Sequence, residues 1–202
     1  MSGDVSSWGD LRLWWVKWRW YRRLSLPWNR LRLHREFARR RAFCKWPING
    51  EPLEMLRDGR LEIGEGTLLE PGAWLTGGET RRIRIGAGVF LNQNVMIAAA
   101  DLVEIGDHCM FGNGCVITDA DHRHDRRDLP VTWQGFVSKG PTRIADNVWC
   151  GAGVVVTSGV TIGPRCVIGA GSVVTQDIPE GCVAVGAPAR VVRTISEASS
   201  AP

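Results

Sequence analysis

The sequence predicts an all-β solenoid, a parallel β-helix of about five coils, because one short pattern recurs along most of the chain. Between Ile63 and Ile178 an apolar residue returns every six positions, and a small or aliphatic residue often follows four places later. Fifteen hexads start at residues 63, 69, 75, 85, 91, 97, 105, 111, 117, 144, 150, 156, 162, 168 and 174, and thirteen of them begin with Ile, Leu or Val. Short internal repeats of this kind are typical of solenoids.

Each hexad fits one side of a triangular coil, with three hexads to a coil. The leading aliphatic residue is expected to pack inward and the later small residue to fill the corner, while Gly or Asn supplies the turn conformation. Coils stack at the strand spacing of about 4.8 Å, so five coils make a rod about 24 Å long.

Extra residues interrupt the repeat at a single corner of the predicted prism. They fall at residues 81–84, 103–104 and 123–143, after the first, second and third groups of three hexads. Chemistry should lie where a repeat breaks, because the repeat itself only builds a core. The largest break is a protruding loop that begins directly after His122.

The chain is expected to divide into three segments of different charge. These are an N-terminal arm over residues 1–59, a β-helix over residues 60–180 and a tail over residues 181–202. Residues 8–46 hold twelve Lys or Arg and two acidic residues, a net charge of +10, although the whole chain carries only +4. The two ends therefore have different roles.

The cysteines indicate a reducing, cytoplasmic setting. Cys109, Cys115 and Cys166 stand at the small inward position of their hexads, and Cys150 stands at a leading position. We expect all four to be reduced core residues, since no CxxC pair points to zinc or redox work.

The N-terminal arm interleaves tryptophan with arginine. Six tryptophans lie within residues 8–28, and charged residues interrupt every apolar run well short of the ~20 residues of a spanning helix. Such a helical, basic stretch can lie in a membrane interface and bind anionic lipid at the inner face of the cell membrane. The alternative is that it packs on the solenoid or on a neighbouring subunit. Nothing in it resembles a nucleic-acid reader.

Three stretches besides the hexads carry a family resemblance. They are residues 144–152 (IADNVWCGA), residues 160–175 (VTIGPRCVIGAGSVVT) and residues 186–192 (GAPARVV). With them the chain resembles the bacterial hexapeptide-repeat acyltransferases, in the branch of sugar and nodulation-factor O-acetyltransferases. The resemblance covers about residues 60–195 and implies a left-handed β-helix, a homotrimer, and acetyl-CoA as the acyl donor in a groove between subunits.

The resemblance also implies catalytic residues. In that branch the catalytic histidine falls seventeen residues after the Ile of an I-G-D hexad, and from Ile105 this position is His122. A histidine can take the proton of an attacking hydroxyl near neutral pH. The resemblance further implies that Asn92 contacts the acceptor and that the backbone amide of Ala152 stabilises the oxyanion. Asp119 and Asp121 could orient His122, but they and His124 also have a simpler interpretation as solvated loop residues.

The remaining implied positions belong to the donor groove. They are Trp149, Ala152 and Ala170 along the groove, and Arg190 and Arg193 at its phosphate end. No metal ligand is implied.

The leading hypothesis is therefore an O-acyltransferase that uses acetyl-CoA, or another acyl-CoA, and acts on a glycan or glycolipid hydroxyl. Transfer to an amino sugar or another small amine, to serine or to a xenobiotic stays open. A zinc enzyme like the carbonic anhydrases would need three converging histidines, and a non-enzymatic trimeric scaffold would not need the loop at His122.

Overall fold

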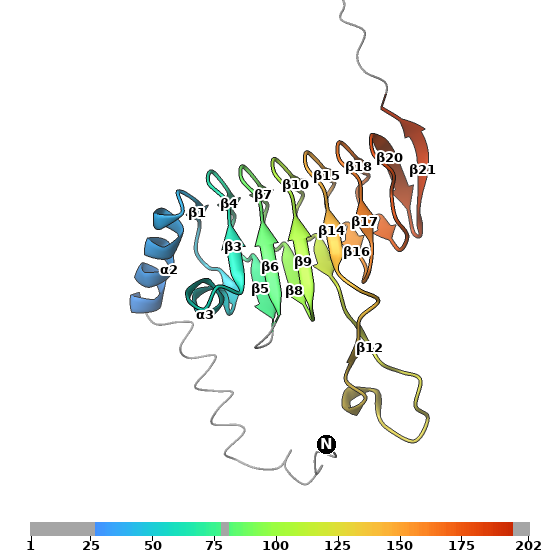
Figure 1. Ribbon diagram of the computed structural model, residues 1–202, viewed down its shortest axis with the longest axis horizontal. Helices are drawn as coiled ribbons and strands as arrows, with labels where there is room; N and C mark the ends of the chain where they lie inside the picture. Colours follow the sequence, from blue (N-terminus) through green and yellow to red (C-terminus); the bar gives the residue numbers. More distant parts are fainter. Residues whose placement is uncertain (1–26, 78–80, 196–202) are drawn as a thin grey trace, which may run out of the picture.

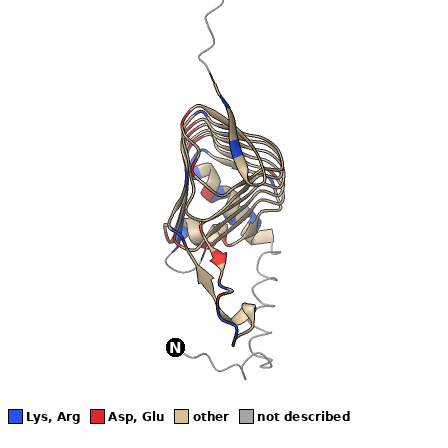
Figure 2. Ribbon diagram, turned by 90° about the vertical axis from the view of Figure 1, so that its right-hand side faces the viewer, with Lys and Arg blue, Asp and Glu red and all other residues tan. Residues whose placement is uncertain are grey.

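The computed structural model describes residues 27–77 and 81–195 and shows a rod of stacked coils (Figure 1). Seen along the rod, the coils superpose as a triangle (Figure 2). Each side of the triangle is a sheet whose coil strands run parallel, which confirms the predicted fold class. The rod has about six coils, slightly more than the five predicted.

Three sheets, here named A, B and C, form the three sides. Sheet A holds β1 (Phe43–Cys44), β4 (Leu68–Leu69), β7 (Phe90–Leu91), β10 (Met110–Phe111), β15 (Trp149–Cys150), β18 (Val167–Ile168), β20 (Cys182–Gly186) and the antiparallel β21 (Ala189–Thr194). Sheet B holds β2 (Asn49–Gly50), β5 (Trp74–Gly77), β8 (Met96–Ala99), β11 (Val116–Thr118), β16 (Val155–Val156) and β19 (Val173–Val174). Sheet C holds β3 (Leu61–Ile63), β6 (Arg82–Ile85), β9 (Leu102–Ile105), β14 (Thr142–Ile144) and β17 (Thr161–Ile162).

The additional coil precedes the first hexad recognised in the sequence. β1 pairs with β4 and β2 pairs with β5, so the parallel ladders begin at Phe43. The short helix α3 (Pro52–Arg57) interrupts this coil before β3. On sheet B the inward position of this first coil is Gly50, where a Cβ atom would lie 1.9 Å from the carbonyl oxygen of Leu75. An aliphatic residue cannot occupy this position, which hides the coil from a search for repeats.

The core is the one that the hexads predict. All fifteen leading residues are buried, and so are the twelve small or aliphatic residues four places later. The six cysteines are free and buried, which confirms Cys109, Cys115, Cys150 and Cys166 as core residues. Burial raises the pKa of the Cys109 thiol to about 11, so it stays protonated at neutral pH.

The turns follow the same period. In most hexads the fourth residue has positive φ, as at Gly66 (75°), Asn94 (59°) and His108 (57°), and among the described residues the exceptions are Ala100, Ala120 and Asp177. Asn and Gly tolerate this conformation best. His108 also adopts it, which identifies His108 as a turn residue in the middle of its coil.

The corner between sheets B and C carries every large insertion, as predicted. α3 follows β2 there, and residues 119–141 leave the rod after β11 as a long loop (Figure 1). Within this loop β12 (Asp121–His122) pairs antiparallel with β13 (Phe136–Val137), and the 3-10 turn η2 (Val131–Trp133) lies between them.

The helix α2 (Pro27–Arg39) lies across the N-terminal end of the rod (Figure 1). Leu33 and Phe37 on its inner face join the core, at 3% and 1% exposed area. The last part of the predicted arm is therefore folded onto the solenoid. Most of the tryptophan-rich stretch over residues 8–28 lies outside the described residues, with Trp28 an exception at 70% exposed.

Asp119 fixes the root of the long loop. Its carboxylate is fully buried and accepts hydrogen bonds from the backbone N–H groups of Ala100 (2.5 Å), Asp101 (2.7 Å) and Leu102 (2.6 Å) in the adjacent coil. The interpretation of Asp119 as a solvated loop residue is wrong. This carboxylate supplies the hydrogen-bond acceptors that a backbone strand would otherwise offer to these three N–H groups, because the inserted residues form no strand there.

We predict that Asp119→Ala lowers the free energy of unfolding by about 3 kcal/mol, because three N–H donors lose a charged acceptor. Asp121→Ala is the matched control, since Asp121 is a partly exposed residue two positions further along the same loop. Urea unfolding of the two variants measures the difference. Equal stabilities would show that the buried carboxylate does not hold this corner.

Candidate functional site

The three outer faces of the rod differ in chemistry. On sheet C the outward side chains form a ladder of alternating charge, in which Arg84 lies 3.4 Å from Glu62 and 3.5 Å from Glu104. Arg143 continues the ladder at 3.3 Å from Glu104. These side chains are partly exposed, so the ion pairs contribute little to stability. The charged side chains nevertheless indicate that the outer face of sheet C is exposed to solvent.

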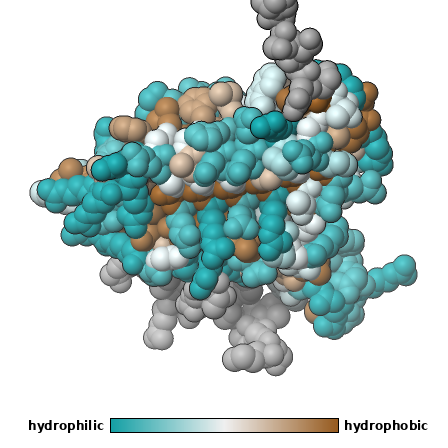
Figure 3. Space-filling view, turned by 45° about the horizontal axis from the view of Figure 1, so that its top comes forward, coloured by the Kyte–Doolittle hydropathy of each residue, from teal (hydrophilic) through white to brown (hydrophobic). Residues whose placement is uncertain are grey.

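Sheets A and B instead carry apolar outward rows. On sheet A the row is Phe43, Leu68, Phe90, Met110, Trp149, Val167 and Val183, and on sheet B it is Trp74, Met96, Val116, Val155 and Val173. Phe43, Met110 and Trp149 are 63%, 49% and 53% exposed. The face shown in Figure 3 also has hydrophobic residues aligned along the rod. Contiguous apolar rows of this length are typical of surfaces that bind a partner or ligand.

His122 lies where the long loop leaves the rod. Its backbone belongs to β12, opposite Phe136 of β13, and Arg123 donates to the carbonyl of Gly135 across the next pair (3.0 Å). The imidazole is exposed and contacts the Phe136 ring, with 4.4 Å between centroids and 38° between planes. Exposure leaves the imidazole accessible to a substrate.

His124 differs from its neighbour. Its Nδ1 atom lies 3.2 Å from the backbone carbonyl oxygen of His122, and its side chain stands in the exposed part of the loop. Its contact to the loop backbone identifies it as part of the loop structure.

The other residues expected at the site gather at the corner between sheets A and B. Asn92 follows β7 directly before the turn into sheet B, and Ala152 after β15 and Ala170 after β18 are the first residues of the corresponding turns. Ala152 and Ala170 are exposed, and within the described residues their backbone N–H groups donate no hydrogen bond. Two stacked amides are therefore available to a ligand along this corner.

Trp149 and Arg193 lie in one line across sheet A. Trp149 pairs in register with Val167, Val167 with Val183, and Val183 with Arg193. Three strand spacings therefore separate Trp149 from Arg193, a distance of about 15 Å. Arg190 is on the same strand, also exposed, and donates to its neighbour's carbonyl group (Ala189, 2.9 Å).

One protomer does not bring the two halves of the site together. Ala152 and Asn92 lie at the corner where sheet B begins, whereas His122 lies beyond the corner where sheet B ends. Six residues of nearly extended chain separate the two corners, on the order of 20 Å. A base and an oxyanion donor for the same carbonyl group must lie much closer than this.

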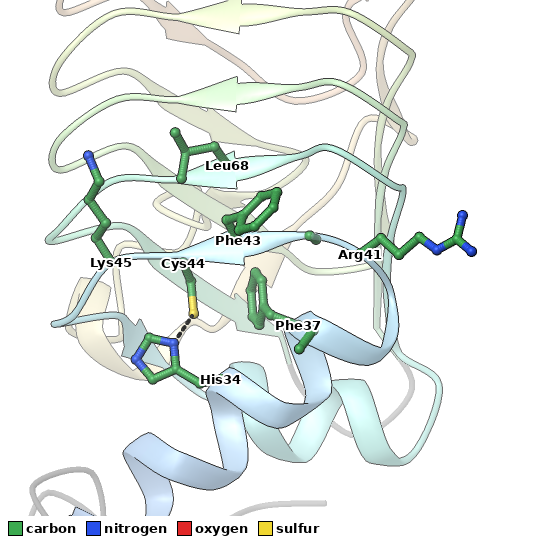
Figure 4. Close-up of a pocket in the computed structure, with 9 residues that line it drawn as sticks. His34, Phe37, Arg41, Phe43, Cys44, Lys45 and Leu68 are labelled. Atoms are coloured by element: carbon green, nitrogen blue, oxygen red, sulfur yellow. Dashed lines mark hydrogen bonds between the residues drawn. The ribbon is translucent and has the colours of Figure 1, made fainter.

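A hollow lies between α2 and the first strand of sheet A (Figure 4). It has a volume of about 690 Å³ and is lined by His34, Phe37, Ala38, Arg41, Ala42, Phe43, Cys44, Lys45 and Leu68. The Cys44 sulfur lies 3.6 Å from Nδ1 of His34, but burial raises the pKa of this thiol to about 11. The thiol is therefore neutral, and Cys44 does not supply a thiolate nucleophile to the hollow.

Among residues 27–77 and 81–195, no group of three or more His, Cys, Asp or Glu side chains is arranged to hold a metal ion. In the same part of the chain, no helix combines the length and the apolar character that crossing a bilayer requires.

Comparison with known proteins relates this arrangement to enzymes. Residues 141–176 match the family model described as bacterial transferase hexapeptide (six repeats). The chain is 37% identical over 147 residues to the galactoside O-acetyltransferase of Lactococcus lactis, covering 73% of this chain and 69% of the relative. It is 41% identical over 137 residues to nodulation protein L of Rhizobium meliloti, covering 67% of this chain and 72% of that protein.

A solved structure gives the same result. A galactoside acetyltransferase in complex with coenzyme A is 35% identical, with a TM-score of 0.61, and the match covers 72% of this chain and 71% of that one. The repeat, the fold and these identities agree with each other. The chain therefore belongs to the hexapeptide-repeat, acetyl-CoA-dependent acetyltransferases, in the branch of the sugar O-acetyltransferases.

Proposed function

We propose that this protein transfers an acetyl group from acetyl-CoA to a hydroxyl group of a glycan or glycolipid, with His122 as the general base. The observation that carries the proposal is the exposed imidazole at the root of the long loop over residues 119–141, where the repeat is interrupted. The sugar O-acetyltransferases among its relatives support a hydroxyl acceptor. An amino sugar or another small amine, serine or a xenobiotic is the alternative acceptor.

In this reaction His122 takes the proton of the acceptor hydroxyl as its oxygen attacks the thioester carbonyl carbon. The C–O bond forms, the C–S bond breaks, and the imidazolium returns the proton to the sulfur of CoA. The free N–H group of Ala152 donates to the carbonyl oxygen as negative charge develops there. Asn92 positions the acceptor. No covalent acyl-enzyme is required.

Sheet A and its corner with sheet B suit the donor. The stacked amides of Ala152 and Ala170 can hydrogen-bond the carbonyl groups of pantetheine, and the exposed Trp149 indole offers an apolar wall. Arg193 and Arg190, about three strands further along, suit the phosphates of CoA.

The site is complete only when a second copy is present, so we propose a homotrimer. His122 of one protomer then serves the donor groove of its neighbour. The apolar rows of sheets A and B are the faces that neighbouring copies would cover, because closed symmetric assemblies bury such surfaces.

The N-terminal arm suits an anionic membrane surface. On α2 the side chains of Arg32, Arg35 and Arg39 are exposed beside Trp28 and Leu31, at 70% and 44% exposed. Basic residues and indole rings on one surface favour the headgroup region. We propose that the enzyme works at the inner face of the cell membrane on a lipid-linked acceptor.

We predict that His122→Ala lowers kcat by about 10²- to 10⁴-fold, because the general base is lost, while the affinity for acetyl-CoA is retained. His124→Ala is the control and should keep most activity. Thioester loss over a panel of galactosides and other sugars measures kcat, and isothermal titration with acetyl-CoA measures affinity. Equal losses in both variants, or loss of acetyl-CoA binding in the first, would reject His122 as the base.

We predict that sedimentation equilibrium at micromolar concentration gives a trimer, and that Met110→Glu dissociates it. A charge in the middle of the apolar row of sheet A opposes burial of that face. Arg143→Glu, on the charged face, is the control and should remain trimeric. A wild-type monomer with full activity would exclude a site shared between subunits.

We predict that deletion of residues 1–26, which removes five of the arm's six tryptophans and five of its basic residues, strongly weakens sedimentation with anionic vesicles at low salt and leaves transfer to a soluble sugar intact. The truncation must stop before Pro27, because α2 and β1 belong to the core. Binding of the full chain should weaken with added salt and be absent on neutral vesicles. Full-length protein that ignores anionic vesicles would refute membrane attachment.

A further inference from the structure

We propose that Phe136 is the positioning residue for the His122 imidazole. The inference rests on the proposed role of His122 as the base. It starts from the pairing of β12 with β13, in which His122 and Phe136 stand directly opposite each other. Because Arg123 and Gly135 form the adjacent hydrogen-bonded pair, His122 and Phe136 form the other kind of antiparallel pair, in which side chains are closest.

No hydrogen bond holds the imidazole. Within the described residues neither ring nitrogen of His122 has a hydrogen-bond partner. The side-chain contact that the imidazole does make is with the Phe136 ring. The two nearby carboxylates are engaged elsewhere. Asp119 accepts from backbone N–H groups of the adjacent coil, and Asp121 lies 3.4 Å from Nζ of Lys139. Histidine bases are commonly oriented by a carboxylate or a carbonyl group, and here an aromatic ring takes that role.

Phe136 is itself held in place. Its backbone is fixed by β12, and the guanidinium of Arg81, from the insertion of an earlier coil, lies over its ring at 5.8 Å from the centroid. Lys139 donates its backbone N–H to Oγ of Ser158 at 2.8 Å, which ties the end of the loop to the rod. The ring thus contacts an earlier coil through Arg81, and the loop that carries it is tied to a later coil through Ser158.

Phe136 does not serve the core. Its side chain is 54% exposed, whereas fully buried phenylalanines such as Phe37 and Phe111 are about 1% exposed or less. Truncating it therefore changes the orientation of the imidazole more than the stability of the fold. A ring contact restricts the tilt of the imidazole and leaves both nitrogens available, one toward the acceptor and one toward water.

Proton NMR of the histidine rings in the full-length protein tests the contact without any substrate. The His122 signals are those lost in His122→Ala. In Phe136→Leu they should move downfield, because the ring current of Phe136 is lost, and in Phe136→Tyr they should stay. Trp133→Leu is the matched control, an aromatic residue of the same loop that is 44% exposed. Unchanged His122 signals in Phe136→Leu would overturn the proposal.

Kinetics test the consequence. Phe136→Leu should lower kcat by about 10- to 100-fold, as expected for a misplaced base, with the KM for acetyl-CoA unchanged, and Phe136→Tyr should restore kcat. Moved signals with an unchanged kcat would overturn the positioning role. If His122→Ala keeps its activity while the ring-current shift is present, the proposed base is wrong and the ring contact stands.

Discussion

The whole molecule depends on one constraint, the in-register stacking of inward side chains from coil to coil. Each inward side chain stacks directly on the inward side chain at the equivalent position of the next coil, one strand spacing away. The volumes of the two side chains must therefore be compatible. The two leading residues that are not aliphatic show this directly. Phe111 and Cys150 are register partners on sheet A, and the small thiol follows the large ring. A change of size at one coil is therefore felt at the coils on both sides.

This constraint leaves function to the surface. Inward positions are fully used by packing, and the backbone groups are used by the parallel ladders, so chemistry is restricted to corners and outward rows. The three faces then diverge, with charge on sheet C and apolar rows on sheets A and B. The corner between sheets B and C, which carries the long loop, and the corner between sheets A and B, which carries the free amides, are the two places where the repeat offers reactive groups.

The six-residue period was sufficient to predict the core, because every leading residue from Ile63 to Val174 is buried. The apolar outward rows could also have been found, since Phe90, Met110 and Trp149 share the last position of their hexads. The first coil escaped because Gly50 replaces an aliphatic residue. Asp119 and Phe136 escaped for another reason. Their partners are distant in sequence or lie across an aperiodic loop, and composition does not reveal such contacts.

The two ends of the rod determine whether it remains a discrete particle. A stack of parallel strands presents unpaired backbone groups at each end, and two such rods could join end to end into a filament. At one end α2 and α3 lie over the first coil (Figure 1). At the other, β21 pairs antiparallel with β20 and reverses the strand direction of sheet A. A second rod thus meets helices at one end and, on sheet A, a strand of reversed direction at the other, which disfavours end-to-end growth of the parallel ladders.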